Sequence, residues 1–98
     1  MSLNTSQMSA VEVDVAVSNA FRLISPDFEF TTTIGPGRVN LVGGFGLGGF
    51  GARIVKTLEG WIMQTNIPGD HLYRLDDLES WDAIPQMALD CRAKPVVE

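Results

Sequence analysis

The glycine-rich stretch from Gly35 to Gly51 limits what this chain can fold into more than any other segment. It reads GPGRVNLVGGFGLGGFG and holds eight of the ten glycines in the 98-residue sequence. Glycine has no Cβ atom, so a cluster of glycines marks tight turns, bulges or close approach of another group to the backbone. The rest of the chain is therefore interpreted relative to this stretch.

The first half of the stretch predicts a β-hairpin. Residues 35–37, Gly-Pro-Gly, form a turn signal, because Pro36 fixes φ and the flanking glycines tolerate unusual backbone angles. The preceding residues 28–34 are rich in aromatic and β-branched side chains, and period-2 spacing places Phe28, Phe30, Thr32 and Ile34 on one face. Over 38–42, the same spacing places Val39 and Leu41 on one face. Two such runs around a short turn are typical of a hairpin.

The second half, GGFGLGGFG, allows three interpretations. In the first, Gly44, Gly46 and Gly49 belong to a G-x-G-x-x-G loop that binds an anion through backbone N–H groups. This interpretation requires a helix that starts at Ala52, and Arg38 would supply positive charge. The pattern arises almost automatically in so glycine-rich a run, and the chain is too short for two mononucleotide-binding halves.

The other two interpretations differ in where the apolar side chains of the loop point. In the second, Phe45, Leu47 and Phe50 are exposed tips of a flexible loop and contact a partner. In the third, the glycines let a strand bulge or bend, and the same three side chains fill the core. The sequence leaves all three interpretations open.

Two periods compete in the segment before the hairpin. Every second residue over 11–17 is valine, which predicts a strand, followed by a turn and a second strand over 21–24. The alternative is a helix with an apolar stripe through 10–24, and Ser9 with Glu12 matches an S-x-x-E capping box. The β-branched valines lead us to predict the strand.

The segment after the glycines is also ambiguous between helix and strands. Residues 52–65 can place their apolar side chains on one helical face, or form two strands around a turn at 58–60. We predict the hairpin, because Gly60 inside a helix would cost about 1 kcal/mol relative to alanine. A turn at 66–70, centred on Pro-Gly, and a short strand over 71–75 follow.

Residues 76–92 are the best helix candidate in the chain. Ser80 can cap the helix, acidic residues occupy the first turn, and Pro85 is tolerated near a helix start. Trp81, Ile84, Ala88 and Cys91 then define one apolar face. The predicted fold is α+β: an antiparallel sheet of four or five strands packed by a C-terminal helix. We expect one domain over 9–94, between a flexible tail at 1–8 and another at 95–98.

Composition excludes several classes of function. The net charge of −5 and the pI of about 4.6 argue against nucleic acid as a partner, because phosphate binding requires a basic patch. The N-terminus has no signal-peptide pattern, and no apolar run approaches the length of a membrane span. One cysteine excludes an internal disulfide. We therefore expect no membrane partner and a cytoplasmic location.

Few residues suit catalysis or metal binding. His71 and Cys91 are the only histidine and cysteine, and Cys91 falls on the apolar helical face, which favours burial over a nucleophilic role. These residues and the scattered acids do not form a metal site, so we predict no catalytic residues, no metal and no cofactor.

The expected function is a small acidic protein-binding module that is not an enzyme, of the inhibitor, immunity-protein or regulatory-adaptor kind. Its predicted contact residues are the loop tips and an acidic group that faces a basic partner surface: Phe45, Leu47, Phe50, Asp76, Asp77 and Glu79. A homodimer is a further expectation. One alternative is small-ligand or anion binding at Arg38, Gly44, Gly46 and Gly49. The other is a structural subunit of an assembly such as a virion.

Overall fold

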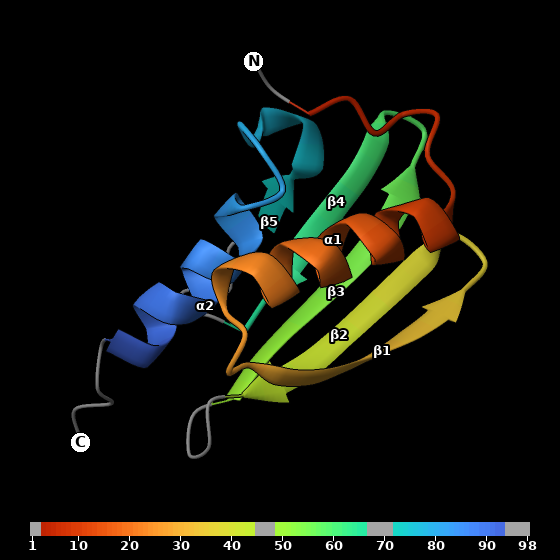
Figure 1. The fold of residues 1–98 in the computed structure, drawn as a ribbon. Coiled ribbons are helices and arrows are strands. Elements are labelled where there is room, and N and C mark those ends of the chain that lie inside the picture. The colour runs from red at the N-terminus through yellow and green to blue at the C-terminus, as the bar shows by residue number, and fades with distance from the viewer. Residues whose placement is uncertain (1–2, 45–48, 67–71, 94–98) are drawn as a thin grey trace.

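The computed structural model describes residues 3–44, 49–66 and 72–93. They form a five-stranded antiparallel sheet and two α-helices (Figure 1), which confirms the predicted α+β architecture. The elements in chain order are α1 (Ala10–Ile24), β1 (Glu29–Gly35), β2 (Arg38–Gly44), β3 (Gly49–Thr57), β4 (Gly60–Thr65), β5 (Leu72–Arg74), the 3-10 helix η1 (Leu75–Asp77) and α2 (Ala83–Ala93).

The sheet is a meander in which each strand pairs with its neighbour in sequence, in the order β1-β2-β3-β4-β5. Both predicted hairpins are confirmed. In the first, Gly35 pairs with Arg38, and Gly37 adopts a φ of 66° in the turn between them. In the second, Thr57 pairs with Gly60, whose φ is 120°. The turn residues thus determine the register of both hairpins locally.

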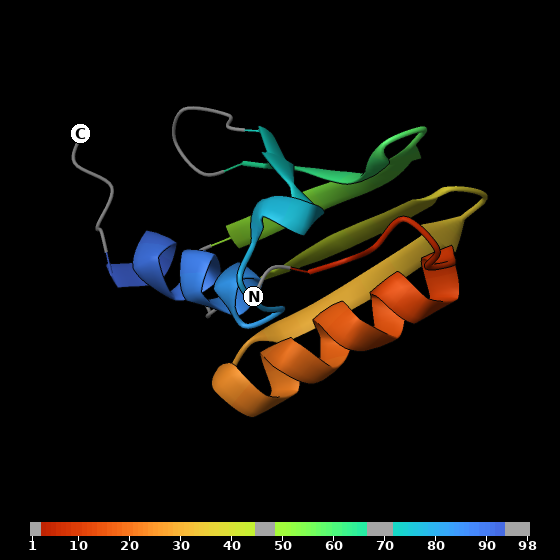
Figure 2. The same cartoon turned by 90° about the horizontal axis from the view of Figure 1, so that it is seen from above.

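Both helices lie on the same side of the sheet (Figure 2). Their apolar side chains and those of the facing strands form one core. It includes Val13, Val17 and Phe21 from α1, Val39, Leu41, Phe50, Ile54, Trp61 and Met63 from the sheet, and Leu75, Ile84 and Ala88 from the C-terminal segment. The opposite side of the sheet is covered by no described element.

The prediction of strands over 11–17 and 21–24 is wrong, because residues 10–24 form α1. The capping box is present: the Ser9 hydroxyl accepts from the Glu12 N–H at 3.2 Å, and the Glu12 carboxylate accepts from the Ser9 N–H at 2.8 Å. Valine lowers helix propensity by only a few tenths of a kcal/mol per residue. Burial of the helical stripe against the sheet outweighs that cost.

The segment from residue 3 to 8 is anchored, in contrast to the flexible tail expected from its polar sequence. Thr5 is fully buried, and its N–H and hydroxyl both donate to Oδ1 of Asp76, at 2.7 and 2.8 Å. The indole N–H of Trp61 donates to the carbonyl of Met8 at 3.1 Å. A strand side chain and an acid from η1 therefore hold this segment beside the sheet.

The C-terminal helix is shorter than the predicted span of 76–92, since α2 begins at Ala83. The Ser80 hydroxyl accepts from the Asp82 N–H at 3.3 Å, just before the helix. Pro85 is the third residue of α2, where its missing N–H removes no intrahelical bond. The short strand expected over 71–75 is β5, whereas most of the turn predicted at 66–70 lies outside the described residues, as does the tail at 95–98.

Candidate functional site

The residues predicted from the glycine-rich loop are only partly described. Phe45, Gly46 and Leu47 lie outside the described residues. Phe50 is 2% exposed, and its ring centroid lies 6.0 Å from that of Phe21 in the aromatic part of the core. For Phe50, therefore, the structure supports the core interpretation and not that of an exposed tip.

The predicted acidic group is divided between two environments. Asp76 faces inward and binds Thr5, so its carboxylate is part of the scaffold. Asp77 and Glu79 are exposed. Of the predicted group, Asp77 and Glu79 thus lie at the surface.

The strand geometry separates the residues of the alternative anion site. Gly44 pairs with Gly49 across β2 and β3. Arg38 is at the opposite end of β2, six residues from Gly44, which corresponds to roughly 20 Å along an extended strand. Ala52 lies inside β3, so the helix start that this interpretation requires is absent there.

A different surface emerges from the sheet itself, on the side that faces away from the helices. We call it the open face. Two of its apolar side chains are largely exposed, Val42 at 65% and Leu72 at 67%. Alternation along the paired strands assigns to it Glu29, Thr31, Thr33, Arg38, Asn40, Val42, Gly51, Arg53, Val55, Ile62, Gln64, Leu72 and Arg74.

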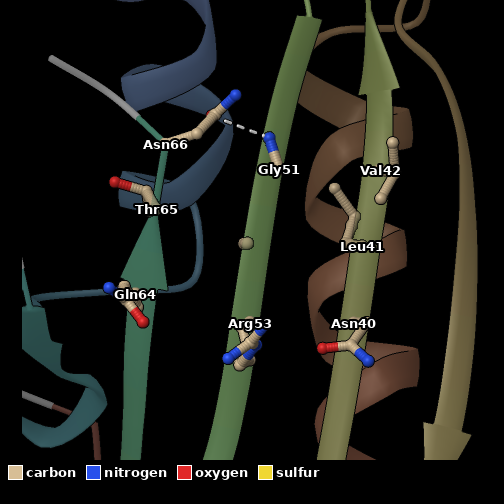
Figure 3. A pocket seen from close by; sticks show the side chains of 9 residues that line it. Asn40, Leu41, Val42, Gly51, Arg53, Gln64, Thr65 and Asn66 are labelled. Atoms are coloured by element: carbon tan, nitrogen blue, oxygen red, sulfur yellow. Dashed lines mark hydrogen bonds between the residues drawn. The ribbon is translucent and has the colours of Figure 1, made fainter. Parts of the chain in front are cut away.

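A recess of about 520 Å³ lies on the open face over β2, β3 and β4. Figure 3 shows it with both helices behind the strands. Gly51 forms part of its floor, and a Cβ placed there would be 3.8 Å from the nearest atom, so the missing side chain leaves real space. Asn66 borders it, and its side-chain carbonyl accepts from the Gly51 N–H at 2.9 Å.

The open face is locally basic, although the chain carries a net charge of −5. Arg38, Arg53 and Arg74 project from it, against one acid of the described strands, Glu29 on β1. Arg74 lies 3.7 Å from the carboxylate of Glu59, an exposed ion pair that contributes little to stability. Among the described residues, neither Arg38 nor Arg53 is in a salt bridge.

The lining of the recess offers hydrogen bonds rather than reactive groups. Its polar side chains include the amides of Asn40, Gln64 and Asn66 and the guanidinium of Arg53. These groups can bind carboxylates and peptide groups, but they include no acid, histidine, serine or cysteine. Elsewhere in the described part of the chain, no three His, Cys, Asp or Glu side chains gather as metal ligands would.

The two residues considered for nucleophilic chemistry fall wholly or partly outside the described part of the chain. His71 is outside the described residues, and the side chain of Cys91 is not described although its backbone belongs to α2. Neither α1 nor the described part of α2 combines the length and hydrophobicity that a membrane crossing requires.

Alternation in the sequence predicted that the strand over 38–42 has two faces, but it did not predict which of them is exposed. Val39 and Leu41 were assigned to one face of a predicted strand, so Asn40 and Val42 belong to the other. This alternation does not show which face the helices cover, because each of the two faces carries at least one apolar side chain. Comparisons with protein-family models, with curated proteins and with solved structures find no match to this chain.

Proposed function

We propose that this chain is a protein-binding module without enzymatic activity, and that it binds its partner through the open face of the sheet. The observation that carries the proposal is the exposure of Val42 and Leu72 on a regular sheet surface, at 65% and 67%. Val42 on β2 and Leu72 on β5 lie on either side of the recess, with β3 and β4 between them. Exposed apolar groups with a rim of polar side chains mark interaction surfaces. Here amides and arginines provide that rim.

The shape and composition of the face favour a protein over other ligands. Small-molecule sites are concave and largely enclosed, whereas this recess is open to solvent along the strands. Nucleic-acid binding on a sheet depends on aromatic side chains that stack with bases. The outward positions of the described strands carry none, because Trp61 and Tyr73 project to the helix side.

The charge of the open face also defines the partner. The sequence suggested a basic partner that meets exposed acids, but the open face carries Arg38 and Arg53 without ion-pair partners among the described residues. We therefore propose a partner that presents apolar side chains together with carboxylates. Charge complementarity of this kind fixes orientation and accelerates association.

A capture experiment with matched variants tests this proposal. Val42→Ser/Leu72→Ser removes the two exposed apolar groups, and Val15→Ser/Leu23→Ser makes the same two changes on α1, where those residues are 49% and 80% exposed. We expect the open-face variant to bind the captured partner at least about tenfold more weakly, because interface anchors carry most binding energy.

Both double variants must first show the native far-UV circular dichroism spectrum and a similar midpoint of thermal unfolding. The α1 variant should then capture the same partner as the native chain. If the open-face variant binds as the native chain does, or if only the α1 variant loses binding, the open face is not the interface and the proposal fails.

A further inference from the structure

The two edges of the sheet differ in length. β5 provides one edge and has three residues, whereas β1 provides the other and has seven. In Figure 1, no described element lies beyond β1. Its pairing with β2 is continuous, one residue against one, without a bulge. Its sequence, EFTTTIG, has no proline or lysine, the residues with which proteins commonly block a free edge.

The turn determines which backbone groups of β1 face outward. In a two-residue hairpin, the residues that close the turn, here Gly35 and Arg38, exchange hydrogen bonds, and such pairs then recur at every second residue. Thr33 and Thr31 therefore bond to β2. The N–H and C=O groups of Phe30, Thr32 and Ile34 point away from the sheet.

We infer that this edge pairs with the β1 edge of a second copy of the chain, antiparallel and centred on a two-fold axis at Thr32. The outward groups of Thr32 then bond to those of Thr32 in the second copy. The outward backbone groups of Phe30 bond to those of Ile34 in the second copy, and the outward groups of Ile34 bond to those of Phe30 in the second copy. The two sheets become one continuous sheet of ten strands, twice the five in one chain. This contact is formed along the β1 edge, and on the open side of the sheet its side chains are Glu29, Thr31, Thr33 and Arg38, whereas Val42 and Leu72, which carry the proposed function, take no part in it.

Side chains in this register are complementary on both surfaces of the sheet. On the helix side, Phe30 lies opposite Ile34 of the second copy, an aromatic and β-branched pair of the kind that stabilises adjacent strands. The Ile34 side chain is 42% exposed in the single chain, and contact with Phe30 of the second copy buries it further. On the other side, Thr31 lies opposite Thr33 of the second copy. No like charges face each other anywhere in the register.

Charge identifies the occupant as another copy and not as an arbitrary strand. The same register places Glu29 opposite Gly35 of the second copy. The Arg38 side chain lies over Gly35, since its Nε is 2.6 Å from the position that a Cβ on Gly35 would occupy. Glu29 therefore reaches Arg38 of the second copy, and symmetry repeats the pair. Within the described chain, neither Glu29 nor Arg38 is in a salt bridge.

Sedimentation equilibrium of the native chain and charge-reversed variants tests the dimer. The native chain should approach twice its monomer mass of 10.7 kDa as concentration rises. Glu29→Arg and Arg38→Glu should each weaken the dimer about tenfold or more, because each turns two attractive pairs into two repulsive ones. Arg53→Glu, on the open face away from the β1 edge, is the matched control and should dimerise as the native chain does.

Mixing the two single variants gives the sharpest result. A heterodimer of Glu29→Arg with Arg38→Glu restores two opposite-charge contacts, so the equimolar mixture should dimerise where each variant alone does not. A monomeric native chain at millimolar concentration would overturn the inference. So would a native dimer in which both reversals dissociate no more readily than the Arg53→Glu control.

A backbone variant separates edge pairing from other modes of dimerisation. Proline at position 32 removes an outward N–H that bonds to nothing in the single chain, so Thr32→Pro should remove the dimer without breaking a β1–β2 hydrogen bond. Native circular dichroism confirms that the variant is folded. A folded Thr32→Pro variant that dimerises as tightly as the native chain contradicts the inference.

Discussion

Asp76 shows how one residue in a polar run acquires a structural role from a distant contact. It lies in the acidic sequence DDLESWD, where the exposed Asp77 is its neighbour. In the sequence the two residues cannot be distinguished, because both are aspartates in the same acidic run. Only the contact with Thr5, 71 positions away, distinguishes them, because local patterns carry no information about that separation. The same reason hides the burial of Phe50, whose aromatic neighbour Phe21 comes from another element.

This difference predicts the stability of two alanine variants. Asp76→Ala should lower the free energy of unfolding by about 1.5–3 kcal/mol, since hydrogen bonds to a charged group are lost and the buried Thr5 donors are left without an acceptor. Asp77→Ala, at an exposed position, should stay within about 0.5 kcal/mol of the native value. Urea denaturation measures both, and equal effects would contradict the role assigned to Asp76.

Helix α1 shows why some elements can be predicted from sequence and others cannot. The hairpins were predicted because their turns are encoded locally, by Pro36-Gly37 and by Gly60. The segment over 10–24 carried two valid periodicities, and the valines favoured the wrong one. The helix is stabilised because its apolar stripe packs on the sheet. That sheet is formed by residues later in the chain, so the segment's own sequence does not reveal the contact.

Two valine substitutions distinguish the helix from the strand. In α1, Val13 is fully buried and Val15 is 49% exposed, whereas a strand would place both on one face. Val13→Ala should therefore lower the free energy of unfolding by about 2 kcal/mol. Val15→Ala should change it by less than about 0.5 kcal/mol, because alanine's higher helix propensity offsets the lost contact. Similar losses in the two variants would argue against the helix.

At the scale of the whole molecule, the sequence predicted the class of fold but not the candidate site. Alternation in the strands identified two faces, yet the position of α1 decides which face is covered. Because residues 10–24 were predicted to form strands and not a helix, the covered face could not be identified. The sequence therefore did not indicate that Val42 and Leu72 are surface residues. The glycine-rich loop drew attention because its composition is unusual, whereas the open face consists of ordinary strand residues around one glycine, Gly51.

Hydrogen exchange should report the arrangement of β1 in the molecule. At low concentration, amides of Thr31 and Thr33 should exchange slowly, because they bond to β2, whereas those of Phe30, Thr32 and Ile34 should exchange quickly. At concentrations where the chain dimerises, the three fast amides should become protected. Amide exchange measured by NMR at two concentrations tests this, and equal exchange along β1 would contradict the assigned bonding pattern.

The unequal lengths of the two sheet edges bear on how far association can proceed. Pairing of β1 with β1 about a two-fold axis consumes both long edges, and only the three-residue β5 edges remain at the ends of the joined sheet. A head-to-tail contact would instead leave a fresh edge after every addition and permit a growing fibril. Self-pairing at β1 therefore terminates growth at two chains and guards this threonine-rich strand against amyloid-like polymerisation.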